Sequence, residues 1–167
     1  MIDETASTRS PVAKDALLRL PLLSVDVETN PADDNRIFLI GAVRTGDSRS
    51  LSLSVRRTAA GEIERQLDEL ARGARYLVGH NFRRHDLPAL RSQYPGLSVI
   101  RLPVIDTLEI SAIAFPNNPY HRLVKGYKLV SDSRNDPLKD ARLTLDLLSD
   151  EIAALENDGV IVQARRK

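Results

Sequence analysis

Short apolar runs separated by turn-forming residues fill the first third of the chain. The segment LLSVDVE (22–28) and the segments 36–46 and 48–57 each predict a strand. The sequence NPADDN separates the first two strands, and the stretch around Gly46 separates the second from the third. Short turns of this kind favour an antiparallel meander of three strands.

Helical spacing follows the predicted meander. Apolar residues three or four apart predict a helix over 61–74, and the apolar run RYLVGHN (75–81) predicts a further strand. A short helix is expected at 87–94. The segment 102–110 is either a strand edge or the start of a helix, and 115–135 is a long irregular connection. Strands that alternate with helices are typical of an α/β domain.

The last predicted element is the clearest. Over 137–156 an apolar stripe recurs at helical spacing and ends near Asn157 and Gly159. The stripe consists of Leu138, Ala141, Leu145, Leu148, Ile152 and Leu155. The pattern predicts a helix with one buried face.

Length and composition are those of one globular domain. The chain has 167 residues, of which 42% are hydrophobic, enough for a single core. We expect a flexible N-terminal segment over 1–16, a folded domain over 17–157 and a C-terminal tail over 158–167 that could lead to a further domain. No apolar run approaches the roughly 20 residues that cross a bilayer, and the polar N-terminus is unlike a signal peptide. We therefore expect a cytoplasmic protein that makes no membrane contact.

Charge and cysteine content narrow the chemistry. The formal net charge of +1 neither supports nor excludes a nucleic-acid partner. The absence of cysteine excludes disulfides, thiolate nucleophiles and zinc–cysteine sites. A metal ion would have to bind oxygen or imidazole ligands.

Two acids interrupt the first apolar run. Asp26 and Glu28 are two residues apart in a predicted strand, so both side chains project from the same face. Neighbouring carboxylates repel each other unless a cation lies between them, and hard divalent ions prefer such ligands. Because an Asp-x-Glu pair also arises often by chance, the pair alone has little weight.

Two further acids occupy predicted helix starts. Asp86 follows Gly79, His80 and Asn81 at a junction between a strand and a helix. A helix cap explains Asp86 about as well as a functional role does. Asp140 lies one turn into the last helix, where stabilisation of the helix dipole is the alternative to a functional role.

In this order the acids resemble those of the DEDD superfamily of 3′-to-5′ exonucleases, the DnaQ-like proofreading nucleases with a ribonuclease H-like fold. The resemblance runs from about Leu22 to Leu155. The spacing from Asn81 to Asp86 and the sequence HDLPAL are similar to those of proofreading domains in family B DNA polymerases. The resemblance implies an α/β fold with a mixed sheet flanked by helices, and makes 17–157 an exonuclease domain.

The resemblance also implies a mechanism. The four carboxylates would bind two divalent ions, Mg or Mn, that promote hydrolysis of a phosphodiester at the 3′ end of single-stranded DNA or RNA. The implied catalytic and metal-binding residues are Asp26, Glu28, Asp86 and Asp140. Thr29, His80 and Asn81 are expected to contact the substrate. Asp106, in VIDTLEI, lies where the family often has Asp-Thr, and we assign it a structural role.

The chain departs from the family at the residue that orients or deprotonates the attacking water. The family has a histidine five residues, or a tyrosine four residues, before the last aspartate, and these positions are Asn135 and Asp136 here. Asn135 cannot act as a base, and Asp136 is at least as well explained as a helix cap. His85 and His121 are possible substitutes. Because bound metal ions already activate water, we expect a slower enzyme.

A basic loop provides further candidates for substrate binding. Residues 119–128 gather Arg122, Lys125 and Lys128 with two tyrosines, a mixture that can bind phosphates and stack on bases. A solvated surface turn explains the same residues equally well.

Two alternatives to an exonuclease stay open. A degenerate exonuclease domain could bind nucleic acid or a partner within a helicase or polymerase assembly, and the altered residue at 135 motivates this hypothesis. A ribonuclease H-like endonuclease is the other. An enzyme could equally be fused to, or associated with, a helicase or polymerase.

Overall fold

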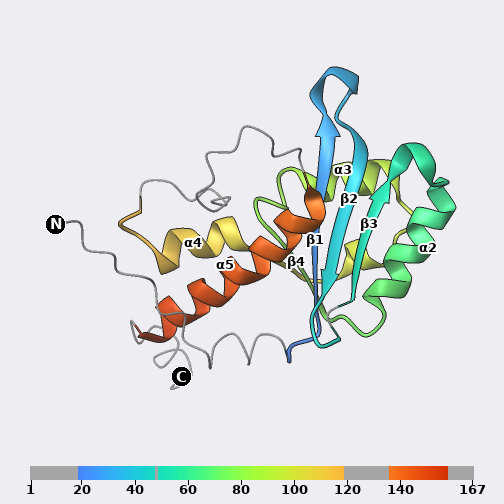
Figure 1. The fold of residues 1–167 in the computed structure, drawn as a ribbon. Helices are drawn as coiled ribbons and strands as arrows, with labels where there is room; N and C mark the ends of the chain where they lie inside the picture. Colours follow the sequence, from blue (N-terminus) through green and yellow to red (C-terminus); the bar gives the residue numbers. More distant parts are fainter. Residues whose placement is uncertain (1–18, 48, 119–135, 158–167) are drawn as a thin grey trace.

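The computed structural model describes residues 19–47, 49–118 and 136–157, which form a sheet with helices on both faces (Figure 1). The five strands are β1 (Leu22–Asn30), β2 (Arg36–Arg44), β3 (Ser50–Ser54), β4 (Tyr76–Gly79) and β5 (Val104–Asp106). Their order in the sheet is β3-β2-β1-β4-β5. The pairs β1–β2 and β2–β3 are antiparallel, whereas β1–β4 and β4–β5 are parallel, so the sheet is mixed.

Different helices cover the two faces of the sheet. The helices are α2 (Ala60–Ala71), α3 (Asp86–Gln93), α4 (Thr107–Ala114) and α5 (Pro137–Asn157), with short 3-10 turns η1 (Pro31–Asp33), η2 (Val55–Arg57) and η3 (Val99–Arg101). One apolar cluster joins the sheet to α2 and α3, and a smaller one joins it to α5. Helix α5 crosses one face of the sheet, and α4 lies beside α5 (Figure 1).

The alternation of side chains along β1 decides which face receives the acids. Val25 is in the cluster under α2 and α3. Ser24 faces the other way, and its hydroxyl donates a hydrogen bond of 2.8 Å to the carbonyl of Ala141 in α5. Asp26 and Glu28 share the face of Ser24 because side chains two apart in a strand point the same way. Both acids therefore project on the side of α5.

The predicted elements differ from the observed ones in detail. The third predicted strand, 48–57, pairs only over Ser50–Ser54, because the chain then turns into η2 and leaves the sheet. The segment 102–110 contains both alternatives, a three-residue strand followed directly by α4. The predicted N-terminal segment, 1–16, and the tail, 158–167, lie outside the described residues.

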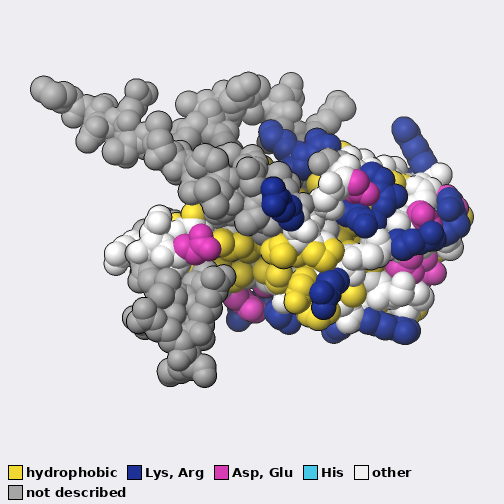
Figure 2. Space-filling model, turned by 90° about the horizontal axis from the view of Figure 1, so that it is seen from below, with side chains coloured by type: hydrophobic (Ala, Val, Ile, Leu, Met, Phe, Trp, Pro, Cys, Tyr) yellow, Lys and Arg dark blue, Asp and Glu magenta, His cyan; other side chains and the backbone are white. Residues whose placement is uncertain are grey.

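The surface of the described residues is mixed. Viewed from below, apolar side chains gather near the middle, while Lys and Arg side chains lie beside Asp and Glu at the end that carries α2 (Figure 2). Arg65 of α2 forms an ion pair with Glu62 at 2.6 Å, and Arg72, directly after the helix, forms one with Glu69 at 2.5 Å. Within the described part of the chain no helix is both long and apolar enough to cross a membrane.

Candidate metal centre

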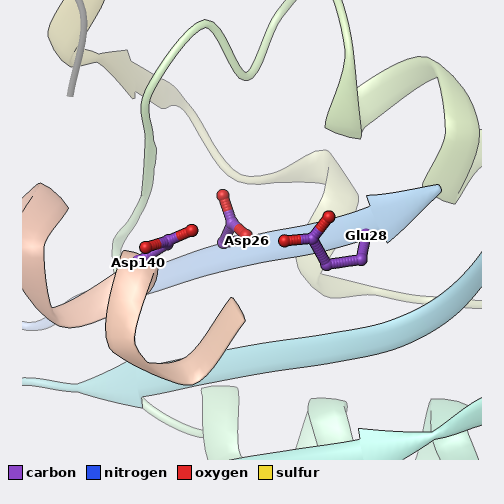
Figure 3. Close-up of side chains that lie close together, drawn as sticks. All are labelled: Asp26, Glu28 and Asp140. Carbon is purple, nitrogen blue, oxygen red and sulfur yellow. The ribbon is translucent and has the colours of Figure 1, made fainter. Parts of the chain in front are cut away.

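Three carboxylates from two elements meet beside the sheet. Asp26 and Glu28 extend from β1, and Asp140 extends toward them from the first turn of α5 (Figure 3). One oxygen from each residue lies within 4.8 Å of the others. Three anionic groups this close repel one another, and a divalent cation among them would relieve the repulsion. The all-oxygen donor set suits a hard ion such as Mg or Mn.

Gly41 permits α5 to approach β1 this closely. Gly41 lies directly opposite Asp26 in the β1–β2 ladder. A Cβ atom at Gly41 would lie 2.2 Å from the backbone nitrogen of Leu138 and 2.2 Å from the carbonyl carbon of Pro137. Because position 41 is a glycine, the first turn of α5 packs directly on β2, and Asp140 comes close to Asp26 in the neighbouring strand β1.

Asp136 fixes the start of α5. Its side-chain Oδ1 accepts hydrogen bonds from the backbone N–H groups of Leu138 (3.1 Å) and Lys139 (3.3 Å). Its backbone carbonyl accepts a hydrogen bond from the N–H of Asp140 at 3.0 Å. Asp136 therefore has the contacts of a helix cap, and these contacts hold the turn that carries Asp140.

Asp86 approaches the acid cluster from the opposite edge of β1. Strand β4 pairs with β1 only as far as Ser24, and Asp86 Oδ1 accepts a hydrogen bond of 2.9 Å from the N–H of Val27 beyond that point. Asp86 is only 7% exposed. Burial raises its pKa to about 7; the hydrogen bonds from the backbone of Val27 and of Asp86 itself oppose this rise, and the charges of Asp106 and Glu28 add to it.

All four acids line one cleft of about 590 Å³, which we call the acidic cleft. Thr29 continues the wall beyond Glu28, and Arg84 and His85 line the side formed by the start of α3. Asp86 belongs to this cleft without belonging to the three-carboxylate group. The acidic cleft therefore combines oxygen ligands with one guanidinium and one imidazole.

His80 and Asn81 have other surroundings. The His80 Nδ1 atom lies 2.9 Å from the hydroxyl of Thr107. Asn81 has a positive φ of 56°, and its backbone N–H donates to Asp106 Oδ1 at 2.8 Å. Neither residue lines the acidic cleft. The sequence predicts that both residues contact the substrate. This stays a prediction, because neither residue is part of the wall of the acidic cleft.

Asp106 organises the loop between β4 and α3. Its carboxylate accepts hydrogen bonds from the backbone N–H groups of Asn81, of Arg83 at 3.0 Å and of Leu108 at 3.1 Å. Asp106 thus caps α4 while it holds the turn that leads to Asp86. These contacts agree with the structural role assigned to Asp106.

Some predicted residues cannot be placed. His121, Arg122, Lys125, Lys128 and Asn135 lie outside the described residues. Two residues of the site were not predicted from the sequence: Gly41, against which α5 packs, and Arg84, which lines the acidic cleft. A glycine inside a strand is a recognised sign of close backbone approach, so Gly41 could have been found.

Comparison with solved structures identifies the fold. A structure described as a nuclease in its apo form is 20% identical, with a TM-score of 0.57 over 91% of this chain and 81% of that one. A family B DNA polymerase from the hyperthermophilic archaeon Pyrobaculum calidifontis is 16% identical, with a TM-score of 0.43 over 83% of this chain and 24% of that one. The Nibbler EXO domain of Aedes aegypti is 16% identical, with a TM-score of 0.46 over 91% and 85%. No protein-family model and no curated protein matches the sequence.

The match to the apo nuclease confirms the predicted fold class. The mixed five-stranded sheet flanked by helices is an α/β fold of the ribonuclease H-like type. The three-carboxylate group at the junction of β1 and α5 is consistent with that fold and is suited to divalent metal. One fold can carry many activities, and the residues of the site determine which one it has.

Proposed function

We propose that the protein is a metal-dependent exonuclease that hydrolyses phosphodiester bonds at the 3′ end of single-stranded DNA or RNA. One observation carries the proposal. Oxygens of Asp26, Glu28 and Asp140 lie within 4.8 Å of one another in a cleft that also contains Asp86. No structural requirement of the sheet explains this concentration of acids, whereas metal-assisted phosphodiester hydrolysis needs it.

The four acids would hold two divalent ions, Mg or Mn. Bound ions of this kind activate a water molecule and neutralise the charge that develops on the phosphate and the leaving oxygen. The rigidity of β1 and the capped first turn of α5 would keep the carboxylates of Asp26, Glu28 and Asp140 in place. The hydrogen bond from Val27 would keep Asp86 directed toward the same cleft.

Other residues of the acidic cleft would position the substrate. Arg84 is exposed and can pair with a phosphate through its guanidinium. Thr29 can donate a hydrogen bond to the end of the strand. His85 lines the same cleft and is our candidate for orienting the attacking water, because Asp136 is already engaged as a helix cap. The basic residues of the 119–128 loop remain predicted contacts.

A second candidate function is a degenerate exonuclease domain that binds nucleic acid, or a helicase or polymerase partner, without cleavage. The capping contacts of Asp136 favour it, since they leave neither position 135 nor 136 with an evident catalytic base. The four acids in one cleft favour the enzyme, because a binding module has no need to retain them.

Digestion of 5′-labelled single-stranded DNA and RNA with Mg or Mn tests the proposal. We expect a ladder that shortens from the 3′ end and is lost in an Asp26→Asn, Glu28→Gln double variant. A matched control removes two exposed carboxylates, Asp47→Asn with Glu69→Gln, and should digest like the wild type.

Other outcomes separate the alternatives. Cleavage of a circular single strand would favour an endonuclease. A wild-type protein that binds metal and nucleic acid yet cleaves neither substrate would overturn the exonuclease and favour the binding module.

A further inference from the structure

A second, larger hollow adjoins the acidic cleft. It measures about 1140 Å³ and lies on the side of α2 and α3, between the β1–β2 hairpin, the end of β3 and the start of α2. We call it the arginine groove, defined by Arg36, Phe38, Val55, Arg56 and Thr58. The two hollows share Thr29 and Gln93. A chain-like ligand could therefore pass from one to the other along the hairpin.

An irregularity in the sheet forms the junction between the hollows. Glu28 pairs with Leu39, but the next residue, Thr29, pairs with Ile37, so Phe38 has no partner in β1. Such bulges bend a strand and redirect its side chains. Here the bulge follows directly after Glu28 and places the partly exposed ring of Phe38 in the wall of the arginine groove.

Gln93 stabilises this irregular start of β2. Its Oε1 atom accepts a hydrogen bond of 3.0 Å from the N–H of Ile37, and its Nε2 atom donates one of 3.2 Å to the carbonyl of Asn35. Gln93 comes from the last turn of α3, and Asp86 opens the same helix. The geometry of the arginine groove is thus tied to that of the acidic cleft.

Two arginines give the groove its charge. Arg36 and Arg56 are both exposed, and among the described residues neither takes part in an ion pair, in contrast to Arg65 in α2 and Arg72 directly after it. Asp33 is the acid in the lining, so the two arginines leave a net positive charge there. Cations near an aromatic ring and apolar wall are the combination that binds a phosphate backbone and stacks a base.

We propose that the arginine groove binds the nucleotides that precede the scissile end of a single-stranded nucleic acid. The proposal rests on the proposed nuclease function, since the strand would enter the acidic cleft past Thr29. Arg36 and Arg56 contact two phosphates, and Phe38 stacks on one base. These contacts read no base edge, so the groove accepts many sequences.

Equilibrium binding in EDTA, where metal-dependent hydrolysis cannot proceed, tests the groove. The ligands are a 5′-fluorescein trinucleotide and a labelled single strand of about 12 nucleotides, which is long enough to extend beyond the acidic cleft. The wild type should bind the longer strand more tightly. An Arg36→Ala, Arg56→Ala double variant should lose most of that difference, and the slope of log affinity against log salt should decrease by about 1.4.

Two further variants sharpen the test. Phe38→Leu keeps an apolar side chain but removes the ring, and should weaken binding of the longer strand about fivefold or more. The matched control is Arg75→Ala with Arg101→Ala, which removes the same charge from exposed positions outside both hollows, and should leave the length dependence unchanged. Thermal unfolding of each variant checks that it is folded.

The outcomes separate the groove from the nuclease function. Equal binding of the longer strand by the Arg36, Arg56 variant and the wild type would overturn the groove, even if the wild type digests DNA. An equal loss in the Arg75, Arg101 control would also overturn it, because the effect would then be one of net charge. Loss confined to the groove variants would support the groove, even for a protein that digests nothing.

Discussion

Gly41 lies directly across the β1–β2 ladder from Asp26, and its missing side chain leaves the space that the first turn of α5 occupies. The close approach of α5 to Gly41 therefore determines whether Asp140 reaches Asp26 and Glu28 in β1. A Cβ atom at position 41 would overlap backbone atoms of Pro137 and Leu138, which a rotamer change cannot move aside.

We expect Gly41→Ala to displace the start of α5. The displacement should separate Asp140 from Asp26, lower metal affinity and nuclease turnover by about 10-fold or more, and cost about 1–3 kcal/mol of unfolding free energy. Metal titration by calorimetry and digestion of labelled single strands would measure both effects. Gly61→Ala is the control, because a Cβ there meets nothing within 4 Å. Normal metal binding by Gly41→Ala would contradict the role given to Gly41.

The sequence predicted the features of the site that depend on local spacing. The common face of Asp26 and Glu28 follows from the two-residue period of a strand, and the cap at Asp136 follows from the Asp-Pro start of a helix. The ladder irregularity at Phe38 and the contact of α5 with Gly41 were not predicted. A glycine within a strand indicates a close backbone approach, but which element approaches Gly41, like the irregularity at Phe38, depends on how distant elements pack and is not recorded in a window of a few residues.

The partner of Asp86 was unpredictable for a similar reason. Its carboxylate bonds the N–H of Val27 because β4 stops pairing with β1 at Ser24. The length of that ladder depends on the whole sheet. The sequence offered a helix cap as the alternative role of Asp86. A cap would bond the backbone of α3 itself, whereas the Asp86 side chain accepts a hydrogen bond from Val27 in β1.

Asp86 should make the metal-free protein less stable as pH rises. Its pKa is raised from 3.8 to about 7 in the folded protein, chiefly by burial. A carboxyl whose folded pKa exceeds its unfolded pKa contributes stability that is complete below the unfolded value and is lost as pH rises through the folded value. The window is therefore about pH 4 to 7, and the loss is of the order of a few kcal/mol.

Asp86→Asn tests this dependence. Asparagine keeps an oxygen that can accept the Val27 hydrogen bond but carries no charge. We expect the variant in EDTA to lose less thermal stability than the wild type over that window, the remaining loss being that of the second buried carboxyl, Glu151. A wild type that grows more stable from about pH 4 to 7, with Asp86→Asn lacking the gain, would reverse the sign and refute the argument.

Glu151 should add a second, independent pH dependence at the interface of α4 and α5. The residue is 0% exposed, its Oε1 accepts a hydrogen bond from the hydroxyl of Ser111, and its Oε2 has no partner among the described residues. Burial, the largest cause, raises its pKa from 4.5 to about 8, and the charges of Asp106 and Asp150 contribute. Stability conferred by the protonated form is lost as pH rises from about 4.5 to 8.

Glu151→Gln should remove that loss. Chemical denaturation at several pH values between about 5 and 8 would show a smaller slope of unfolding free energy against pH for the variant. Glu156→Gln, an exposed position on the same helix, should keep the wild-type slope. Identical slopes for Glu151→Gln and the wild type would show that Glu151 is already ionised when buried.

Asp136 should matter for stability more than for chemistry. Asp136→Asn retains a side-chain oxygen that can accept the hydrogen bonds from Leu138 and Lys139, but it cannot act as a base. We expect its turnover to stay within a few-fold of the wild type, and Asp136→Ala to lose about 0.5–2 kcal/mol of unfolding free energy. A turnover reduced about 100-fold or more in Asp136→Asn, with unchanged stability, would instead identify Asp136 as the base.

His85 is the residue that we expect to assist the attacking water. It lines the acidic cleft together with all four acids and is exposed to solvent there. His85→Ala should lower kcat about 100-fold or more while metal affinity remains unchanged, because a positioned base contributes that much without being a ligand. Added imidazole should restore part of the turnover of His85→Ala and none of that of Asp26→Asn. Imidazole can replace a missing base but not a missing metal ligand. The role would be excluded if His85→Ala had unchanged turnover, or if added imidazole restored none of the lost turnover.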